Sequence, residues 1–369
     1  MAGIYVHIPF CRSKCAYCDF YSVADHRSRE AVTAAILAEH AARLGELDGE
    51  PVKTLYIGGG TPSVLSDDDI ARLASGMLCD TVEEFTIEVN PEDVEPGRVS
   101  RWREAGINRV SMGVQSLSDA ELKAVGRRHD AATALRAIAT LRAGGIANIS
   151  CDLIYGLPGQ SPESWRRSLD VLLATGICHL SAYSLSYEEG TLLYRRLAEG
   201  LVTEAGEDEV VEMYGYLCEA ARAAGFEHYE ISNFARPGFR SRHNSAYWDG
   251  TPYLGLGPGA HSYTRGVRKE VPRGIKEYLA WPAGTRLTSE IESREDRLND
   301  ILVTALRTSD GLPPRLLGED GSRDFLTRAR RHIECGNLEW AERDSEAVLR
   351  IPEERWLVAD ATLRDLLFD

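Results

Sequence analysis

The chain has 369 residues, a length that suggests one large domain plus a smaller one. Its composition, 43% hydrophobic and 27% charged, is typical of a globular protein. Its formal net charge of −15 argues against general affinity for nucleic acid or anionic membranes, since phosphate contacts need clustered basic residues. No run approaches about 18 apolar residues, and the N-terminal MAGIYVHIPF lacks the features of a signal peptide. We therefore expect a cytoplasmic protein without a transmembrane segment, whose eight cysteines are thiols or metal ligands.

Short β-rich runs alternate with helical patterns through the first 200 residues. Strands are predicted at 4–10, 53–59, 84–90, 109–115, 148–157 and 179–186. Helices are predicted between them, near 28–46, 66–78, 118–143 and 161–175. Several strands are apolar on both faces, as buried parallel strands tend to be, so the alternation predicts a parallel α/β sheet or barrel.

The segments that follow these strands are polar or rich in glycine. They read CRSKC, GGTPS, NPED, QSLS and GLPGQ. In parallel barrels the functional site lies at the carboxyl ends of the strands. We therefore expect the chemistry of this chain at that edge.

The alternation weakens after residue 200. A helix is predicted near 204–224 and a seventh strand at 227–235, and the next fifty residues look irregular, with many aromatics and glycines. We predict three parts: a barrel at 1–235, a connecting segment at 236–285, and a small C-terminal domain at 286–369.

The C-terminal part combines helical patterns with a hairpin-like pair at 347–360, which suggests a small α+β domain of winged-helix type. Such domains often bind DNA. This one has 13 arginines against 19 acidic residues, a net charge of −6, which makes it a poor candidate for phosphate contacts. We expect it to pack against the barrel instead.

Three cysteines, Cys11, Cys15 and Cys18, follow the first predicted strand with C-x3-C-x2-C spacing. A disulfide would leave one cysteine over and would need an oxidising compartment. A structural zinc site needs four ligands, and His7 is a candidate for the fourth. An iron–sulfur cluster held by three thiolates would leave one iron without a protein ligand.

The residues around this motif, HIPFCRSKCAYCDF, resemble those of the radical S-adenosylmethionine (SAM) superfamily. In that superfamily the open iron of a [4Fe–4S] cluster is chelated by the amino and carboxylate groups of SAM. The resemblance implies that Cys11, Cys15 and Cys18 hold such a cluster. It also implies a fold: a partial (β/α)6 TIM-like barrel followed by a small α+β, winged-helix-like C-terminal domain.

Further residues near successive strand ends match SAM-contacting positions of the oxygen-independent coproporphyrinogen III oxidase family. Each alone is more often an ordinary polar or turn residue, and GGGTP fails as a phosphate loop because no Gly-Lys-Ser/Thr follows it. The resemblance covers residues 4 to about 310. It implies contacts with SAM from Tyr5, Phe20, Gly58, Gly59, Thr61, Glu88, Gln115, Arg127 and Asp152.

Two local features separate the branches of this family. The oxidase has a fourth cysteine two positions beyond the third, where this chain has Phe20. The stretch His243-Asn244-x-x-Tyr247-Trp248 resembles the H-N-x-x-Y-W motif of HemW-type heme chaperones, in which the histidine is implicated in heme binding. The downstream LGLGPGAHS and the lack of an N-terminal extension fit the same branch.

Heme binding by His243 also has a physical basis. Neutral imidazole is a good axial ligand for heme iron, and Tyr247 and Trp248 offer rings to stack on a porphyrin. Arg240 and Arg242 offer charges for its propionates. The alternative is that His243 is a packed, hydrogen-bonded residue, which is the commoner role of a histidine beside aromatic residues.

The resemblance therefore implies a HemW-like heme chaperone that binds heme and delivers it to acceptor proteins while carrying a [4Fe–4S] cluster and SAM. Resemblance alone suggests a homodimer. One alternative is a radical SAM enzyme that decarboxylates a porphyrinogen or transfers a methyl group, so enzymatic activity stays open. Another is a zinc-stabilised binding module. Phe20 and the HNSAYW stretch favour the chaperone; the cluster and SAM residues do not discriminate between the branches.

Overall fold

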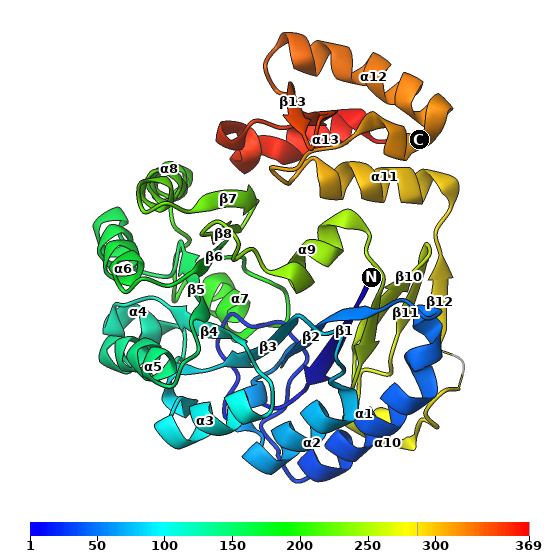
Figure 1. Cartoon of the computed structure of the whole chain (residues 1–369). Helices are drawn as coiled ribbons and strands as arrows, with labels where there is room; N and C mark the ends of the chain where they lie inside the picture. Colours follow the sequence, from blue (N-terminus) through cyan, green and yellow to red (C-terminus); the bar gives the residue numbers. More distant parts are fainter. Residues whose placement is uncertain (286, 369) are drawn as a thin grey trace.

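The computed structural model describes residues 1–285 and 287–368, so the predicted C-terminal domain begins and ends at residues outside the described part. Twelve described strands form one curved sheet in the order β12-β11-β10-β9-β1-β2-β3-β4-β5-β6-β8-β7. Helices cover the outside of the curve, and a smaller C-terminal unit lies across one end of it (Figure 1).

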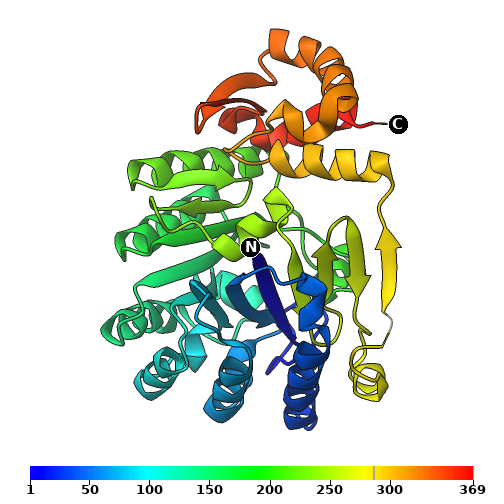
Figure 2. The same ribbon diagram turned by 45° about the vertical axis from the view of Figure 1, so that its right-hand side comes forward.

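Six strands build the parallel part of the sheet and pair in chain order. They are β1 (Ala2–Ile8), β2 (Val52–Gly59), β3 (Glu84–Val89), β4 (Arg109–Gln115), β5 (Asn148–Tyr155) and β6 (His179–Ser184). The helices that connect these strands lie on the convex side (Figure 2), and they are α1 (Arg29–Arg43), α2 (Asp67–Met77), α3 (Pro96–Glu104), α4 (Asp119–Ala124), α5 (Ala131–Ala143) and α6 (Pro162–Ala174). The predicted partial α/β barrel is thus confirmed.

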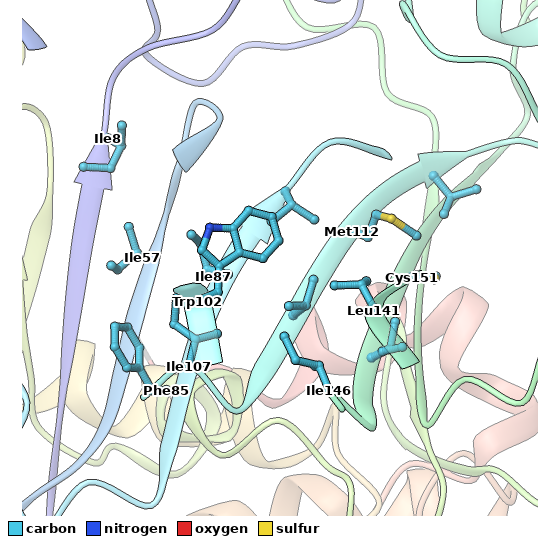
Figure 3. Packing of buried hydrophobic residues seen from close by; sticks show 14 of the residues in the cluster. Ile8, Ile57, Phe85, Ile87, Trp102, Ile107, Met112, Leu141, Ile146 and Cys151 are labelled. Atoms are coloured by element: carbon cyan, nitrogen blue, oxygen red, sulfur yellow. The ribbon is translucent and has the colours of Figure 1, made fainter. Parts of the chain in front are cut away.

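The two faces of these strands differ in polarity. Ile57, Phe85, Ile87 and Met112 point to the helices and pack with buried side chains such as Trp102 (Figure 3). Alternate residues of a strand point to opposite faces, so the concave side receives the intervening residues. These are mostly polar: Thr54, Tyr56, Glu84, Glu88, Arg109, Ser111, Ser150, Asp152, His179 and Ser181. The barrel therefore has an apolar outer layer and a polar interior.

Local signals explain several helix boundaries. Ser66 and Ser161 are N-caps, and their side chains accept hydrogen bonds from the N–H groups of Asp69 and Ser164. The single helix predicted over 118–143 is wrong, because the chain breaks between α4 and α5. Gly126 adopts a φ of +78° at this break, a conformation that favours glycine.

The later part of the barrel is more regular than its sequence suggested. The strand predicted at 227–235 is instead a hairpin of β7 (Glu227–Glu230) and β8 (Asn233–Ala235), with β8 antiparallel to β6. It follows α7 (Leu192–Ala198) and α8 (Glu207–Ala223). The next segment contains α9 (Arg242–Asp249), β9 (Tyr253–Leu256), β10 (His261–Thr264), β11 (Val267–Glu270) and α10 (Ile275–Ala280). Because β9 pairs parallel to β1, this segment extends the main sheet.

Helix α9 lies at the amino ends of the first strands (Figure 1). Glu84, the first residue of β3, accepts hydrogen bonds from the backbone N–H groups of Arg242 and His243, each at 3.0 Å. This carboxylate occupies the favourable position at the helix amino end. The cysteine-bearing loop leaves β1 at its carboxyl end, so the two motifs singled out by sequence lie at opposite ends of the barrel.

The C-terminal unit has its own hydrophobic core, which includes Leu302, Phe325, Leu349 and Trp356. Its elements after β12 (Thr288–Ile291) are α11 (Arg294–Ala305), α12 (Gly318–Glu334), β13 (Glu339–Arg343), β14 (Glu346–Arg350) and α13 (Ala359–Leu366). The hairpin predicted at 347–360 is wrong, because it spans 339–350. The separate core supports the proposed division of the chain, whose boundaries stay predictions. In the described residues, no helix is both long and apolar enough to cross a membrane.

Candidate functional site

A cavity of about 510 Å³ opens at the carboxyl ends of the parallel strands. Most of the residues predicted to form the site line it: Cys11, Cys15, Cys18, Phe20, Gly59, Thr61, Glu88, Gln115, Arg127 and Asp152. Tyr5, Gly58 and His243 do not. The fold thus gathers residues from the loop after β1 and from several strand ends into one place.

Backbone hydrogen bonds fix the cysteine loop at Cys11 and again just after Cys15. The N–H of Cys11 donates to the carbonyl of Val23 at 3.0 Å, and the N–H of Ala16 donates to Val125 at 3.0 Å. The Thr61 hydroxyl donates to the sulfur of Cys11 at 3.4 Å. All three cysteines are free thiols. Three sulfur donors on one anchored loop, facing one cavity, fit an iron–sulfur cluster held by three thiolates.

Burial raises the pKa of the Cys18 thiol to about 11, and the nearby Cys15 and Cys11 add to the shift. Without a cation the Cys18 sulfur would remain protonated at neutral pH. A metal centre reverses this preference, because metal ions bind thiolates and displace the proton.

The glycine-rich edge after β2 brings bare backbone to the cavity. A side chain at Gly59, whose φ is +105°, would begin 2.6 Å from the ring of His7, and one at Gly60 would begin 2.7 Å from the carbonyl oxygen of Phe10. Only glycine fits at these positions. Gly58 serves differently, because its missing side chain makes room for the carboxylate of Glu88 in the cavity wall.

Two half-buried carboxyl groups, Glu88 and Asp152, lie on the inner wall. Glu88 accepts hydrogen bonds from the Tyr56 hydroxyl at 2.8 Å and from the N–H of Gly59 at 3.0 Å, yet burial raises its pKa to about 7. Burial likewise raises the pKa of Asp152 to about 6, although Ser111 donates to it at 3.4 Å. Both groups titrate near neutral pH, and a bound cationic group would stabilise their ionised forms.

The raised pKa of Glu88 gives a stability prediction for the protein stripped of iron and SAM. The folded state holds this proton up to about pH 7, whereas the unfolded chain loses it near 4.5. The free energy of unfolding should therefore fall as pH rises through that window, by up to about 3 kcal/mol from this group. We expect Glu88→Gln to flatten the decrease, as measured by urea unfolding at pH 5 and pH 7.5. An equally steep decrease in the variant would assign it to other groups.

Arg127 enters the cavity from the break between α4 and α5. It donates to the side chain of Asn90 at 2.7 Å, to the carbonyl of Gly113 at 2.5 Å, and to the sulfur of Cys15 at 3.6 Å. Burial opposes its charge, but Tyr17 and Cys15 outweigh that effect and raise its pKa. The Arg127 Nε and the Gln115 Oε1 are buried without hydrogen-bond partners among the described residues. A polar ligand in the cavity could supply the hydrogen bonds that these two atoms lack.

His243 is packed at the amino ends of the first strands, at the end of the barrel opposite the cysteine loop. Its Nδ1 lies 2.8 Å from the Thr54 hydroxyl and its Nε2 lies 3.1 Å from the Tyr247 hydroxyl, both hydrogen bonds. The residue is 1% exposed, and burial lowers its pKa to about 3, so the imidazole is neutral. Its ring stacks on Tyr56 at 5.0 Å and on Tyr5 at 6.2 Å. In this arrangement His243 is a hydrogen-bonded core residue, and Tyr5 lies between it and the cysteine end.

A second cavity, of about 560 Å³, lies between α9, β9, β10 and the C-terminal unit. Tyr247, Trp248, Tyr253 and Tyr263 supply aromatic walls. Four arginines also line the cavity, but Arg268, Arg315 and Arg343 pair with acidic residues, which leaves Arg297 without an acidic partner among the described residues. Sequence analysis identified only Tyr247 and Trp248 among these residues, because the others come from strands and a unit it did not place together.

The two arginines expected to serve heme propionates lie outside this cavity and already have acidic partners. Arg240 pairs with Glu227 and Asp310, at 3.1 and 3.0 Å, and Arg242 pairs with Glu83. They fix the segment before α9 to its surroundings.

Comparison with known proteins places these features in a family. The family model for the radical SAM superfamily matches residues 5–172. The chain is 35% identical to the heme chaperone HemW of Lactococcus lactis over 84% of this chain and 82% of that protein. It is 36% identical to the heme chaperone HemW of Mycobacterium tuberculosis over 99% of this chain and 94% of that protein.

Two further similarities extend this picture. The mitochondrial radical S-adenosyl methionine domain-containing protein 1 of Mus musculus is 37% identical over 84% of this chain and 74% of that protein. Among solved structures, the coproporphyrinogen III oxidase HemN of Escherichia coli, a radical SAM enzyme, aligns with a TM-score of 0.81 at 22% identity, covering 99% of this chain and 88% of that one. At this identity the match shows the fold alone.

Proposed function

Because this chain belongs to the radical SAM superfamily and, within it, to the HemW family, we propose that it is a heme chaperone that binds heme and delivers it to acceptor proteins. The sequence features that favour this branch are Phe20, at the position where the oxidase has a cysteine, and the HNSAYW stretch of α9. The observation that carries the proposal is the placement of α9 beside a cavity of about 560 Å³ with aromatic side chains in its wall.

Membership of the superfamily implies a [4Fe–4S] cluster and SAM. Cys11, Cys15 and Cys18 would hold the cluster, which when bound supplies an iron with an open position and redox chemistry. The backbone of Gly59 allows close approach, and the buried polar groups of Gln115 and Arg127 offer hydrogen bonds to SAM.

Other residues of the wall would complete the SAM site. Glu88 and Asp152 would face the positive charges of SAM, while Phe20, 64% exposed at the rim, would cover its apolar part. Thr61 would position Cys11 through its hydrogen bond. Tyr5 and Gly58 do not line the cavity, so they would support its wall without contacting SAM: Tyr5 packs on Tyr56, and Gly58 makes room for Glu88.

We place the heme in the cavity between α9 and the C-terminal unit. Tyr247 separates this cavity from His243, so the heme iron would reach the Nε2 of His243 once the Tyr247 hydroxyl releases it. Trp248 would stack on the porphyrin. Arg297, which has no acidic ion-pair partner among the described residues, would attract a propionate.

This arrangement predicts that Tyr247→Phe strengthens heme binding. The variant keeps the ring but removes the hydroxyl that occupies Nε2, a hydrogen bond worth about 1 kcal/mol net. We expect about fivefold tighter heme binding in an absorbance titration. Tyr253→Phe is the matched control, because that tyrosine lines the same cavity without a hydrogen bond to His243. Unchanged or weaker binding by Tyr247→Phe would argue against ligation through Nε2.

A transfer assay separates the chaperone from the enzymatic alternative. Protein carrying its cluster, SAM and heme would be mixed with a heme-free acceptor, and heme transfer would be followed by absorbance. In parallel, the protein would be incubated anaerobically with coproporphyrinogen and a reductant, and SAM cleavage would be measured. We expect transfer without decarboxylation. Decarboxylation with no transfer would make the chain an enzyme.

Two further expectations belong to this proposal. The free thiols suit a reducing cytoplasm. A homodimer rests on resemblance alone, and the molar mass measured by light scattering, with and without the cluster, would test it.

A further inference from the structure

A second group of metal-ligating side chains lies where the barrel meets the C-terminal unit. It consists of Cys218 on α8, His228 on β7 and Glu353, which follows β14. The Nδ1 of His228 lies 3.9 Å from the sulfur of Cys218 and 3.1 Å from the Oε1 of Glu353. All three ligand atoms lie within 4.8 Å of one another. We propose that these residues bind a zinc ion that joins the two units.

The distances from His228 Nδ1 to the other two ligand atoms are close to those of a tetrahedral site. Zinc binds thiolate sulfur at about 2.3 Å and imidazole nitrogen or carboxylate oxygen at about 2.0–2.2 Å, so the ligand atoms of a tetrahedral site lie roughly 3.3–3.7 Å apart. The two measured separations lie within a few tenths of an ångström of this range. A thiol and an imidazole are poor ligands for calcium or magnesium, whereas zinc accepts sulfur, nitrogen and oxygen together.

The surroundings of His228 orient it as a ligand. Its Nε2 lies 3.4 Å from the carbonyl oxygen of Ile231, while its Nδ1 faces Cys218 and Glu353. Without a metal, the Nδ1 N–H donates to the ionised carboxylate of Glu353 at 3.1 Å. Zinc would replace this proton, so that the N–H of the neutral ring would lie on Nε2, facing the Ile231 carbonyl, and the Nδ1 lone pair would bind the metal. Metal-binding histidines commonly have such a second partner. Phe234 stacks on the ring at 3.9 Å and Trp356 packs edge-on at 4.3 Å, which holds its orientation.

Two neighbouring side chains, Tyr214 and Arg222, interact with the proposed ligands. The buried hydroxyl of Tyr214 faces Cys218 and finds no oxygen or nitrogen partner among the described residues, so it is placed to donate to a coordinated thiolate. Arg222 donates to Glu353 Oε1 at 3.0 Å from a side chain that is 64% exposed. This cation competes with a metal for the carboxylate and can move into solvent when zinc binds.

The three proposed ligands come from both sides of the contact between the barrel and the C-terminal unit. Cys218 and His228 belong to the barrel, whereas Glu353 belongs to the C-terminal unit next to Trp356 of its core. A bound zinc would therefore hold the C-terminal unit on the barrel. This role does not depend on heme binding or on the cysteine loop.

Zinc binding would be measured by equilibrium dialysis against zinc chloride and elemental analysis. The protein would be the full chain with its iron–sulfur cluster reconstituted, so that Cys11, Cys15 and Cys18 are occupied. Cys218→Ser and Glu353→Gln remove ligands at nearly constant volume. Cys335→Ser, at an exposed thiol, is the matched control. We expect one zinc per chain in the wild type and the control, and at least tenfold weaker binding in the two ligand variants.

X-ray absorption at the zinc edge adds a readout that does not depend on the stability of any variant. We expect one sulfur ligand, with nitrogen and oxygen completing the shell. Arg222→Ala keeps the ligands and removes the competing cation, so it should bind zinc as tightly as the wild type or more tightly. Absence of zinc binding, equal binding by Cys218→Ser, or a shell of three sulfurs would each overturn the proposal.

Discussion

Replacing Cys15 by serine should abolish the iron–sulfur content of the protein. The three cysteines lie on one anchored loop facing one cavity, and loss of one donor leaves a cluster with two thiolates. We expect anaerobically reconstituted wild-type protein to contain about four iron and four sulfide per chain. Cys15→Ser should fall to below about one of each and lose SAM binding. The measurement is iron and acid-labile sulfide analysis together with the absorbance of the cluster.

Cys79→Ser provides the control, since Cys79 is exposed and lies outside the cavity. It should keep the full iron and sulfide content. If the wild type instead bound zinc without sulfide, the chain would be a zinc-stabilised module. Retention of the cluster by Cys15→Ser would show that the loop is not its ligand set.

The second large effect concerns folding. His243→Ala should lower the free energy of unfolding by about 2–4 kcal/mol, because it leaves a cavity under Tyr56 and removes the partners of the Thr54 and Tyr247 hydroxyls. Urea unfolding of the protein without heme would measure this loss. His261→Ala, at an exposed histidine on β10, should change the free energy of unfolding by less than about 0.5 kcal/mol.

This prediction bears on how His243 should be tested. A residue with two hydrogen bonds and 1% exposure contributes to stability whether or not it binds heme. A loss below about 0.5 kcal/mol would contradict the packing described above. The measured free energy of unfolding of the variant gives the temperature range in which it stays folded. Heme binding by the variant and the wild type should be compared within that range.

The parallel strands could be predicted closely from sequence. The run predicted at 109–115 is β4 itself, and β2 differs from its prediction by one residue. These strands alternate an apolar outer face with a polar inner one, and glycine or polar segments mark their ends. The same logic located the cavity, because residues at the carboxyl ends of parallel strands necessarily meet at one edge.

Long-range pairing was not accessible in this way. Nothing local indicates that β9 pairs with β1, more than two hundred residues earlier, so the segment after residue 236 looked irregular. The break between α4 and α5 was missed for another reason: the helical pattern continues on both sides of Gly126, and tertiary contacts pull Arg127 into the cavity. In the C-terminal unit, Pro352 follows β14, and the next apolar run turns into a helix instead of a second strand.

The two ends of the barrel illustrate the limit of motif reasoning. Sequence identified the cysteines and His243 but could not show that they occupy opposite ends, or that His243 is enclosed by Thr54, Tyr56 and Tyr247. It also could not pair the HNSAYW helix with the C-terminal unit across a cavity. That pairing forms the cavity beside Tyr247 and Trp248 in which we propose that heme binds, and the motif alone does not indicate it.

The most direct test is a heme titration of the reconstituted protein, followed by absorbance, beside His243→Ala under conditions in which both are folded. Heme adheres to many apolar surfaces, so the difference between the two proteins matters more than the wild-type curve. We predict stoichiometric binding by the wild type with a histidine-ligated spectrum, and loss of that spectrum in the variant. Equal, weak binding by both proteins would contradict heme ligation by His243 and would favour the radical SAM enzyme instead.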